Sequence, residues 1–321
     1  MKAAVSTDKG LDVRDIPQPK PKPNEVLVKV RAASLNRADL NAARGAGAHG
    51  AMGNVVGLDW SGEVAEVGSE VKGGFKPGDH VMCAGSGGYA EYAVADWGRV
   101  TPKPANLSFE NAATLPVAVA TMHDALITNA KMKPGDSVLI QGASSGVGLM
   151  ALEIAKLMGA RLVIGTSTNA DRRAKLKDFG ADLAIDTSNP SWPDEVLKAT
   201  DGKGVNVIID QVSGSVANGN MKCAAILGRI VNVGRLGGGK AEFDFDLHAG
   251  RRIQYFGVTH RTRSVDELRE ETRVMWADLK DAIAAGKLHL PIDKTFPLGE
   301  AVAAHARMKA NQHFGKILLI P

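Results

Sequence analysis

The stretch Val138-Leu139-Ile140-Gln141-Gly142-Ala143-Ser144-Ser145-Gly146-Val147-Gly148 decides the fold of this chain. It begins with the continuous apolar run typical of a buried strand and then turns through small residues. Apolar side chains recur with helical spacing over residues 149–158 directly afterwards. A strand, a tight turn and a helix in immediate succession predict the start of a βαβ unit.

The same alternation continues downstream. The pattern predicts strands at residues 162–166, 184–186, 205–210 and 230–234, and helices at 171–179 and 192–200. Continuous apolar strands that alternate with helices indicate a parallel sheet covered on both faces. We therefore expect an α/β, doubly wound domain over residues 117–259.

The rest of the chain has a different pattern of apolar residues. Short alternating strands at residues 26–30, 62–68 and 89–94 are separated by glycine and proline, which predicts a compact β-rich domain over residues 1–116. Residues 260–321 contain two helical patterns and a closing strand, with no low-complexity linker before them. We therefore assign this tail to the first domain, which makes that domain discontinuous.

Composition excludes several classes of protein. The 321 residues are 44% hydrophobic and 23% charged, and no run approaches the roughly 18 apolar residues of a membrane span. The net charge of +4 is spread along the chain, so neither nucleic acid nor membrane is expected as a partner. Cys83 and Cys223 are too few for a disulfide framework, and the first residues lack a secretory signal, which predicts a cytoplasmic location.

The glycine-containing turn has the properties of a dinucleotide site. A pyrophosphate requires small side chains and the exposed N–H groups of a helix N-terminus. Gly148 fills the third glycine position of G-x-G-x-x-G and Gly146 adds another, whereas Ala143 and Ser145 replace the first two glycines. An ordinary strand-to-helix turn is the alternative that this loop alone leaves open.

The end of the next strand favours one dinucleotide. NAD enzymes usually carry Asp or Glu there to bind the ribose 2′-hydroxyl, but this strand ends with Thr166 and Ser167. Small hydroxyl side chains leave room for a 2′-phosphate, and the guanidinium groups of Arg172 and Arg173 follow in the next turn. We therefore expect NADPH, with exposed first-turn arginines as the alternative interpretation.

Three segments carry a resemblance to a known family. Residues 34–40 (SLNRADL), 56–62 (VGLDWSG) and 311–317 (NQHFGKI) resemble the zinc-free quinone oxidoreductase branch of the medium-chain dehydrogenase/reductase superfamily. Gly237-Gly238-Gly239 and Arg261-Thr262-Arg263-Ser264 are similar to NADPH:quinone reductases of the zeta-crystallin type. The resemblance covers essentially the whole chain and implies a GroES-like catalytic domain plus a Rossmann coenzyme domain.

The family pattern also allows a prediction about zinc. Zinc enzymes of the superfamily place a Cys in a C-x-x-D segment and a His in G-H-E. Here Asn36 stands three residues before Asp39, and Leu58 stands between Gly57 and Asp59. We therefore expect no metal.

The resemblance implies that Asn36 and Asp39 are catalytic residues beside the nicotinamide. His49 is a further hypothesis for a proton donor, because it is the one side chain of the glycine-rich loop 44–53 that titrates near neutral pH; an exposed loop histidine is the alternative. Asn36 as a simple turn cap and Lys316 as a surface residue are also open. The expected coenzyme contacts are Asn36, Thr121, Ser145, Gly146, Val147, Gly148, Thr166, Ser167, Arg172, Gly234, Arg235, Val258, Thr259 and Lys316.

The expected reaction follows from the missing metal. Without a Lewis acid an alkoxide is hard to stabilise, whereas a quinone or conjugated carbonyl accepts hydride and spreads the resulting charge. The prediction is NADPH-dependent reduction of quinones or related conjugated carbonyls. The alternatives are an enoyl-thioester or enone reductase and a largely non-catalytic NADPH-binding protein. A homodimer through the apolar strand near residues 253–258 is expected, because that strand is otherwise an unprotected edge.

Overall fold

The computed structural model describes residues 1–45 and 51–321. It divides the chain into two compact units, Met1–Ala120 with His260–Pro321, and Thr121–Thr259. The sequence placed these boundaries after residues 116 and 259. His49 lies outside the described residues, so its suggested role stays a hypothesis. Each unit is described by itself below.

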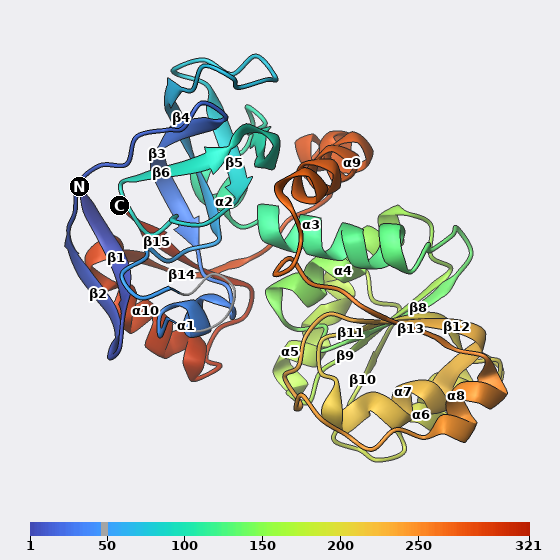
Figure 1. The fold of residues 1–321 in the computed structure, drawn as a ribbon. Coiled ribbons are helices and arrows are strands. Elements are labelled where there is room, and N and C mark those ends of the chain that lie inside the picture. The colour runs from blue at the N-terminus through green and yellow to red at the C-terminus, as the bar shows by residue number, and fades with distance from the viewer. Residues whose placement is uncertain (46–50) are drawn as a thin grey trace. The chain divides into compact units, whose positions relative to one another are not determined.

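The first unit is built mainly on antiparallel strands (Figure 1). Its seven-stranded sheet has the order β14-β15-β3-β4-β5-β7, with β6 paired to β3, and β1 and β2 form a separate ribbon. The strands are β1 (Lys2–Thr7), β2 (Gly10–Asp15), β3 (Glu25–Ser34), β4 (Asp59–Val67), β5 (His80–Ala84), β6 (Tyr92–Asp96), β7 (Val100–Pro102), β14 (Ile292–Pro297) and β15 (Lys316–Ile320). The helices are α1 (Asp39–Ala42), α2 (Phe109–Ala113), α9 (Val265–Ala284) and α10 (Ala301–Lys309), and α3 (Pro116–His123) runs across the boundary between the units.

Strand pairing in this unit joins residues that are far apart in the sequence. Ser34 at the end of β3 pairs with Asp59 at the start of β4. Leu318 of β15 pairs with the same Ser34, so the last strand of the chain returns to the end of β3. This register brings Lys316 and Asp59 to the segment that contains Asn36.

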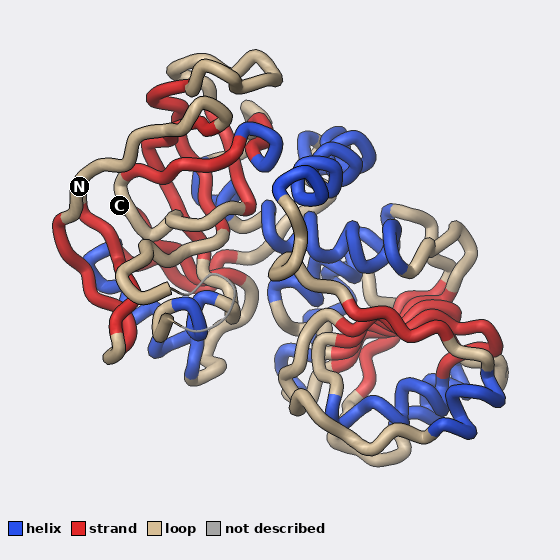
Figure 2. Tube along the Cα trace, in the orientation of Figure 1, coloured by secondary structure: helices blue, strands red, loops and turns tan. Residues whose placement is uncertain are grey.

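The second unit is a parallel sheet between two layers of helices (Figure 2). Its six strands have the order β10-β9-β8-β11-β12-β13. They are β8 (Ser137–Gln141), β9 (Leu162–Thr166), β10 (Leu183–Ile185), β11 (Val205–Asp210), β12 (Ala224–Asn232) and β13 (Gln254–Gly257). The helices are α4 (Gly146–Leu157), α5 (Ala170–Ala174), α6 (Trp192–Ala199), α7 (Ala217–Cys223) and α8 (Phe245–Arg251).

The strand order reverses direction between β8 and β11, which makes this point the switch point where doubly wound sheets bind ligands. The core is apolar: Leu139, Ile208 and Ile230 from the strands pack with Trp192 and Met221 from the helices. The predicted α/β fold class is confirmed. Within the described part of the chain, no helix combines the length and the apolar content that a bilayer crossing requires.

Candidate functional site

The glycine-containing turn joins β8 to α4 and excludes any side chain at one position. A Cβ atom on Gly148 would lie 2.6 Å from the carbonyl oxygen of Gly142 and 2.7 Å from the carbonyl carbon of Ala143. Ser145 caps the helix, since its Oγ accepts the N–H of Gly148 at 3.1 Å. The first turn of α4 can therefore approach the end of β8 only because residue 148 is glycine.

This helix N-terminus fits an anion. The N–H groups of Gly146 and Val147 belong to the first turn, so they have no intrahelical acceptor, and the helix dipole favours negative charge there. The turn lies beside the switch point between β8 and β11. Small side chains, open N–H groups and this location suit the pyrophosphate of a dinucleotide. The structure thus brings Ser145, Gly146, Val147 and Gly148 together at one edge of the sheet.

The end of β9 is bonded to the same turn. Thr166 is buried, and its Oγ1 accepts the N–H of Gly142 at 3.0 Å and donates to Gln141 Oε1 at 2.8 Å. The hydroxyls of Ser144 and Ser167 are 3.0 Å apart. Thr166 therefore bonds both the first residue of the turn and the last residue of β8, while Ser167 contacts Ser144 of the turn.

The two arginines after β9 have different surroundings. Arg173 donates to the carbonyl oxygen of Ser167 at 2.7 Å and forms an ion pair with Asp186 at 3.0 Å. Asp186 also accepts from Ser188, and these bonds lower the pKa of its carboxyl group. Arg172 lies in the first turn of α5, where its N–H donates to Asn169 Oδ1 at 2.9 Å. Arg173 thus fixes the loop around Ser167.

The loops that follow β11 and β12 also pack closely against each other. Asp210 Oδ1 accepts the N–H groups of Val212 and Ser213, both at 2.8 Å, and burial raises the pKa of its carboxyl group. Gly234 follows β12, and a Cβ atom on it would lie 2.6 Å from the carbonyl oxygen of Gln211. The expected coenzyme residue Gly234 is therefore required for close approach of the two loops.

Buried side-chain hydrogen bonds connect the loop after β11 to the end of β8, just before the glycine-containing turn. The sequence analysis did not predict them. Gln141 Nε2 donates to Asn220 Oδ1 at 2.7 Å, and Asn220 Nδ2 donates to Asp210 Oδ2 at 3.0 Å. Together with Thr166 these side chains form what we call the amide network. The signal available in the sequence was a polar residue at the end of each apolar strand, Gln141 after residues 138–140 and Asp210 after residues 205–209.

The remaining expected coenzyme contacts are placed as follows. Arg235 is exposed and follows Gly234 directly. Val258 is buried just after β13, and its N–H donates to the carbonyl oxygen of Asn232 at 3.1 Å, while the next residue, Thr259, is exposed. Thr121 is partly buried within α3.

The first unit holds a buried cluster around Asp59. Lys316 Nζ donates to Asp59 Oδ2 at 2.8 Å and to Asn36 Oδ1 at 2.9 Å. The same carboxylate oxygen accepts from Asn36 Nδ2 and from Ser34 Oγ, each at 3.1 Å, and Oδ1 accepts the N–H of Val117 at 2.8 Å. The ion pair is closed to solvent, with side-chain exposures of 4% for Lys316 and 0% for Asp59. We call Asp59, Lys316, Asn36 and Ser34 the lysine cluster.

Asp39 is a second buried carboxyl group in this unit, but it has no cation bonded to it among the described residues. Its Oδ2 accepts the N–H of Asn36 at 2.8 Å and the hydroxyl of Tyr89 at 2.7 Å, and its Oδ1 has no partner in the part of the chain that the structure describes. Burial raises the pKa of Asp39 to about 7, against the lowering effect of the Tyr89 hydrogen bond. Asp39 therefore holds the backbone of Asn36 in place and changes its protonation near neutral pH.

A histidine contacts the other side of Tyr89. The ring of His305 in α10 makes an edge-to-face contact with the Tyr89 ring at 5.7 Å between centroids. Burial lowers the pKa of His305 to about 4, so the imidazole is neutral at physiological pH. Neither cysteine is reactive, because burial raises the pKa of Cys83 and of Cys223 to about 12.

The residues at the family's zinc positions have other roles in this chain. Asn36 uses both ends of its amide within the lysine cluster, and Leu58 has no metal-binding atom. Over residues 1–45 and 51–321, the structure contains no group of three or more His, Cys, Asp or Glu side chains arranged to hold a metal ion.

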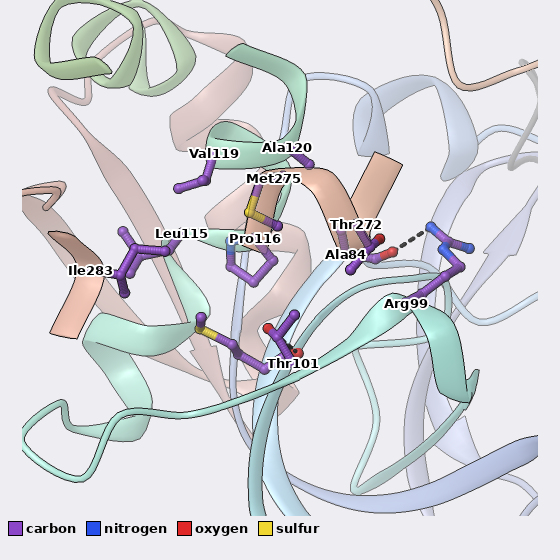
Figure 3. Close-up of a pocket in the computed structure, with 11 residues that line it drawn as sticks. Ala84, Arg99, Thr101, Leu115, Pro116, Val119, Ala120, Thr272, Met275 and Ile283 are labelled. Carbon is purple, nitrogen blue, oxygen red and sulfur yellow. Dashed lines mark hydrogen bonds between the residues drawn. The ribbon is translucent and has the colours of Figure 1, made fainter. Parts of the chain in front are cut away.

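A small apolar pocket also lies within the first unit (Figure 3). Its cavity volume is only about 10 Å³, and it lies between β5, the start of α3 and α9. Its lining is Met82, Ala84, Arg99, Thr101, Leu115, Pro116, Val119, Ala120, Thr272, Met275 and Ile283. Figure 3 shows the Arg99 guanidinium bonded to the carbonyl oxygen of Ala84 at one end. The lining has no carboxylate, imidazole or thiol, so the pocket offers no acid–base group and little room for a ligand.

Comparison with known proteins finds a known domain family in each of the two units. The alcohol dehydrogenase GroES-like domain family matches residues 22–105, and the zinc-binding dehydrogenase family matches residues 146–277. These are the two domains of a medium-chain dehydrogenase/reductase. A quinone oxidoreductase of Pseudomonas aeruginosa is 30% identical over 322 residues, which cover 99% of this chain and 98% of that protein. The chain belongs to the zinc-free quinone oxidoreductase branch of this superfamily, and the resemblance seen in the sequence is confirmed.

Other similar proteins extend the comparison. A highly reducing polyketide synthase of Fusarium pseudograminearum is 30% identical over 92% of this chain, which spans only 12% of that synthase. A mycobacterial protein solved in complex with NADPH superposes with a TM-score of 0.89 at 28% identity over the full length of both chains. The CurK enoyl reductase superposes with a TM-score of 0.87 at 25% identity, over 99% of this chain and 98% of that one. The chain is thus an oxidoreductase of this superfamily.

Proposed function

We propose that this chain is an NADPH-dependent reductase of quinones or related conjugated carbonyls that works by direct hydride transfer without zinc. The observation that carries this proposal is the turn after β8. Its crowded Gly148, the open N–H groups of Gly146 and Val147 and its place at the switch point together suit a dinucleotide. The quinone oxidoreductase relative and the NADPH-bound structure support the same choice.

The coenzyme contacts in this proposal follow the ends of the strands. Gly146 and Val147 bind the pyrophosphate through their N–H groups. Ser167 and Arg172 bind the 2′-phosphate, at a strand end that carries no acidic side chain to repel it. On the nicotinamide side the proposed contacts are Thr121, Gly234, Arg235, Val258 and Thr259. Asn36 and Lys316 of the first unit are proposed as coenzyme contacts through the family resemblance alone.

The chemistry assigned to the protein is binding and orientation. Bound NADPH supplies the hydride, and a conjugated acceptor spreads the charge that arrives with it. Lys316 has three N–H donors, and two of them are bonded within the lysine cluster. The third has no acceptor among the described residues, so it is available to a ligand. Asn36 is held on its backbone by Asp39 and on its side chain by Asp59, so it is fixed before a ligand arrives.

The assignment of a metal-free reaction rests on the donor atoms present. Leu58 has no lone pair to offer, and the Asn36 amide is already bonded at both ends. A reaction that needs little Lewis-acid help fits this set of side chains. The Nδ2 group of Asn36 carries a second N–H besides the one bonded to Asp59, and this N–H is proposed to orient the acceptor or the coenzyme carboxamide, with Asp39 positioning Asn36.

We also propose a cytoplasmic homodimer formed through β13. Among residues 1–45 and 51–321 this strand pairs only with β12 and stands at the end of the sheet order, so its other edge is proposed to pair with a second copy of the chain. Analytical ultracentrifugation should give twice the mass of one chain, and a monomer at micromolar concentration would contradict this part.

One second candidate is favoured by a specific observation. The similarity to the CurK enoyl reductase and to a polyketide synthase supports reduction of an enoyl thioester instead of a quinone. Both reactions add hydride to a conjugated acceptor, so the turn after β8 supports them equally. A largely non-catalytic NADPH-binding protein is the remaining alternative.

A single set of assays separates the three functions. NADPH consumption is measured with 1,4-benzoquinone, with 9,10-phenanthrenequinone and with crotonyl thioester. Turnover with the quinones at a higher kcat/KM than with the thioester supports the proposal, and the reverse order supports the enoyl reductase. If none is reduced while NADPH still raises the melting temperature, the chain is a binding protein.

A further inference from the structure

The side chain of Gln211 is buried and incompletely bonded at the switch point. Gln211 follows β11 directly and is only 3% exposed. Its Oε1 lies 2.9 Å from Ser145 Oγ, at the N-terminus of α4. Its Nε2 has no hydrogen-bond partner in the part of the chain that the structure describes. Buried polar atoms are nearly always bonded, so this amide requires an explanation.

Turning the amide over does not remove the problem. Ser145 Oγ carries one proton, yet both Gly142 O and Gln211 Oε1 lie within 2.9 Å of it, and it already accepts from Gly148 N. With the amide reversed, Nε2 donates to Ser145 Oγ, the hydroxyl donates to Gly142 O, and Oε1 becomes the unpartnered atom. In either orientation one polar end of Gln211 lacks a partner among the described residues.

The backbone around Gln211 is fixed. Its carbonyl oxygen accepts the N–H of Leu236 at 3.2 Å, and the next two N–H groups in the chain are bonded to Asp210. Gly234 packs so closely against Gln211 that a Cβ atom there would collide with it. Adjustment is therefore left to the flexible side chain, whose torsions can turn the amide toward a ligand on the turn.

The position of Gln211 indicates which part of a dinucleotide it faces. In doubly wound sheets the dinucleotide crosses the switch point with its pyrophosphate on the first helix. The adenosine half then lies over β9 and β10, and the nicotinamide half over β11 and β12. Gln211 is at the end of β11 and is bonded to the capping serine of α4, so in that arrangement it would face the junction of the pyrophosphate and the nicotinamide ribose.

We propose that the Gln211 side-chain amide binds a phosphate or ribose oxygen of the coenzyme on the nicotinamide side of the pyrophosphate. This inference rests on the proposed dinucleotide binding and adds a residue to it. Such a bond gives the unpartnered end of the amide its missing partner when the coenzyme is bound. Gln211 is thus a coenzyme-binding residue for the nicotinamide half, whereas Ser167 and Arg172 bind the adenosine half.

The test compares a whole coenzyme with its adenosine half. Gln211→Met keeps the length of the side chain and removes both polar atoms. NADPH binding, measured by fluorescence titration, is expected to weaken about tenfold, the value of one hydrogen bond to a charged or strongly polar group. Binding of 2′,5′-ADP, which lacks the nicotinamide half, is expected to stay within about twofold of wild type. The melting temperature without ligand should fall only slightly, because Ser145 Oγ loses its bond to Gln211 but keeps its bonds to Gly142 O and Gly148 N.

A second variant identifies the atom that is bound. Gln211→Glu retains an acceptor but removes the donor and adds negative charge. If the amide donates to a phosphate oxygen, this variant binds NADPH more weakly than Gln211→Met. If it accepts from a ribose hydroxyl, the variant binds nearly as well as wild type. Gln18→Met, at an exposed glutamine of the first unit, is the matched control and should change nothing.

Two results would overturn the inference. Equal weakening of NADPH and 2′,5′-ADP by Gln211→Met would indicate a purely structural side chain, and no weakening of either would show that the amide makes no contact. Wild-type protein that binds neither ligand would instead refute the proposed function, so the two failures are distinguishable.

Discussion

The two units bury polar groups in opposite ways. The lysine cluster of the first unit balances one carboxylate against one ammonium, and its members come from residues 34, 36, 59 and 316. The amide network of the second unit contains no cation, and its carboxylate accepts two backbone N–H groups and one side-chain amide. The first arrangement neutralises a buried charge with another side chain, whereas the second uses side chains to hold the loop after β11 in place.

This difference determines which changes each unit tolerates. A buried ion pair is sensitive to loss of charge, because removal of one partner leaves the other uncompensated. Loops closed around glycine are sensitive to added volume, because neighbouring backbone atoms cannot move aside. The following predictions break each arrangement in turn, from the largest expected effect to the smallest.

Lys316→Met should have the largest effect on stability. It leaves Asp59 charged, buried and without its cation, which costs about 3–5 kcal/mol of the free energy of unfolding. Urea denaturation measures this loss. The double variant Lys316→Met, Asp59→Asn removes both charges and should recover part of it; a double variant as unstable as the sum of its two single changes would show that the pair is not coupled.

Asp39→Asn tests the buried carboxyl group that has no bonded cation. The folded-state pKa of about 7 lies above the ordinary value of 3.8, so the folded protein holds this proton more tightly than the unfolded chain does. The stabilising contribution is therefore complete below about pH 4 and is lost as the pH rises to about 7, by up to roughly 4 kcal/mol.

The Asp39→Asn variant should lack this pH dependence. Denaturation midpoints of both proteins from about pH 4 to about pH 8 measure the difference between them. His305 acts with the opposite sign, since its lowered pKa of about 4 removes stability as the pH falls from 6.5. Only the difference between wild type and Asp39→Asn therefore isolates Asp39, and parallel pH curves for the two proteins would contradict the assignment.

Gly148→Val breaks the second unit by volume alone. The added side chain meets the carbonyl of Gly142 and forces the helix N-terminus away from β8, so NADPH affinity should fall on the order of a hundredfold. Fluorescence titration measures the change. Gly250→Ala is the control, because nothing lies within 4 Å of a Cβ atom there. Unchanged affinity in Gly148→Val would remove the turn from the proposed site.

Arg172→Ala should have the smallest effect and a selective one. Loss of the guanidinium should weaken NADPH about tenfold and leave NADH unchanged, because only NADPH carries the 2′-phosphate. The ratio of kcat/KM values for the two coenzymes measures this directly. An equal loss with both coenzymes would place Arg172 away from the 2′-phosphate.

The sequence was sufficient where structure depends on neighbours in the chain. The helix pattern at residues 149–158 corresponds to α4 (Gly146–Leu157), and residues 192–200 correspond to α6 (Trp192–Ala199). The pattern at 171–179 is one α-helix in the prediction but α5 (Ala170–Ala174) followed by a 3₁₀ turn (Lys175–Phe179) in the structure. Periodicity does not distinguish these two helix types over such a short length.

The sequence was insufficient where the structure depends on long-range pairing. Asp59 and Lys316 meet because β4 and β15 both pair with the end of β3, and no local pattern specifies that register. Gln211 was missed for a related reason. Its proposed role depends on its hydrogen bond to Ser145, which is 66 positions earlier in the chain. That contact forms only because β11 lies beside β8 in the sheet.

The most direct test of the central claim is the turnover of NADPH with 9,10-phenanthrenequinone by protein that has been treated with a chelator and analysed for metals. We predict that turnover is unaffected by the treatment and by added zinc, and that NADPH is preferred over NADH. Turnover that disappears with the chelator and returns only with zinc, or a preference for NADH, would contradict the account.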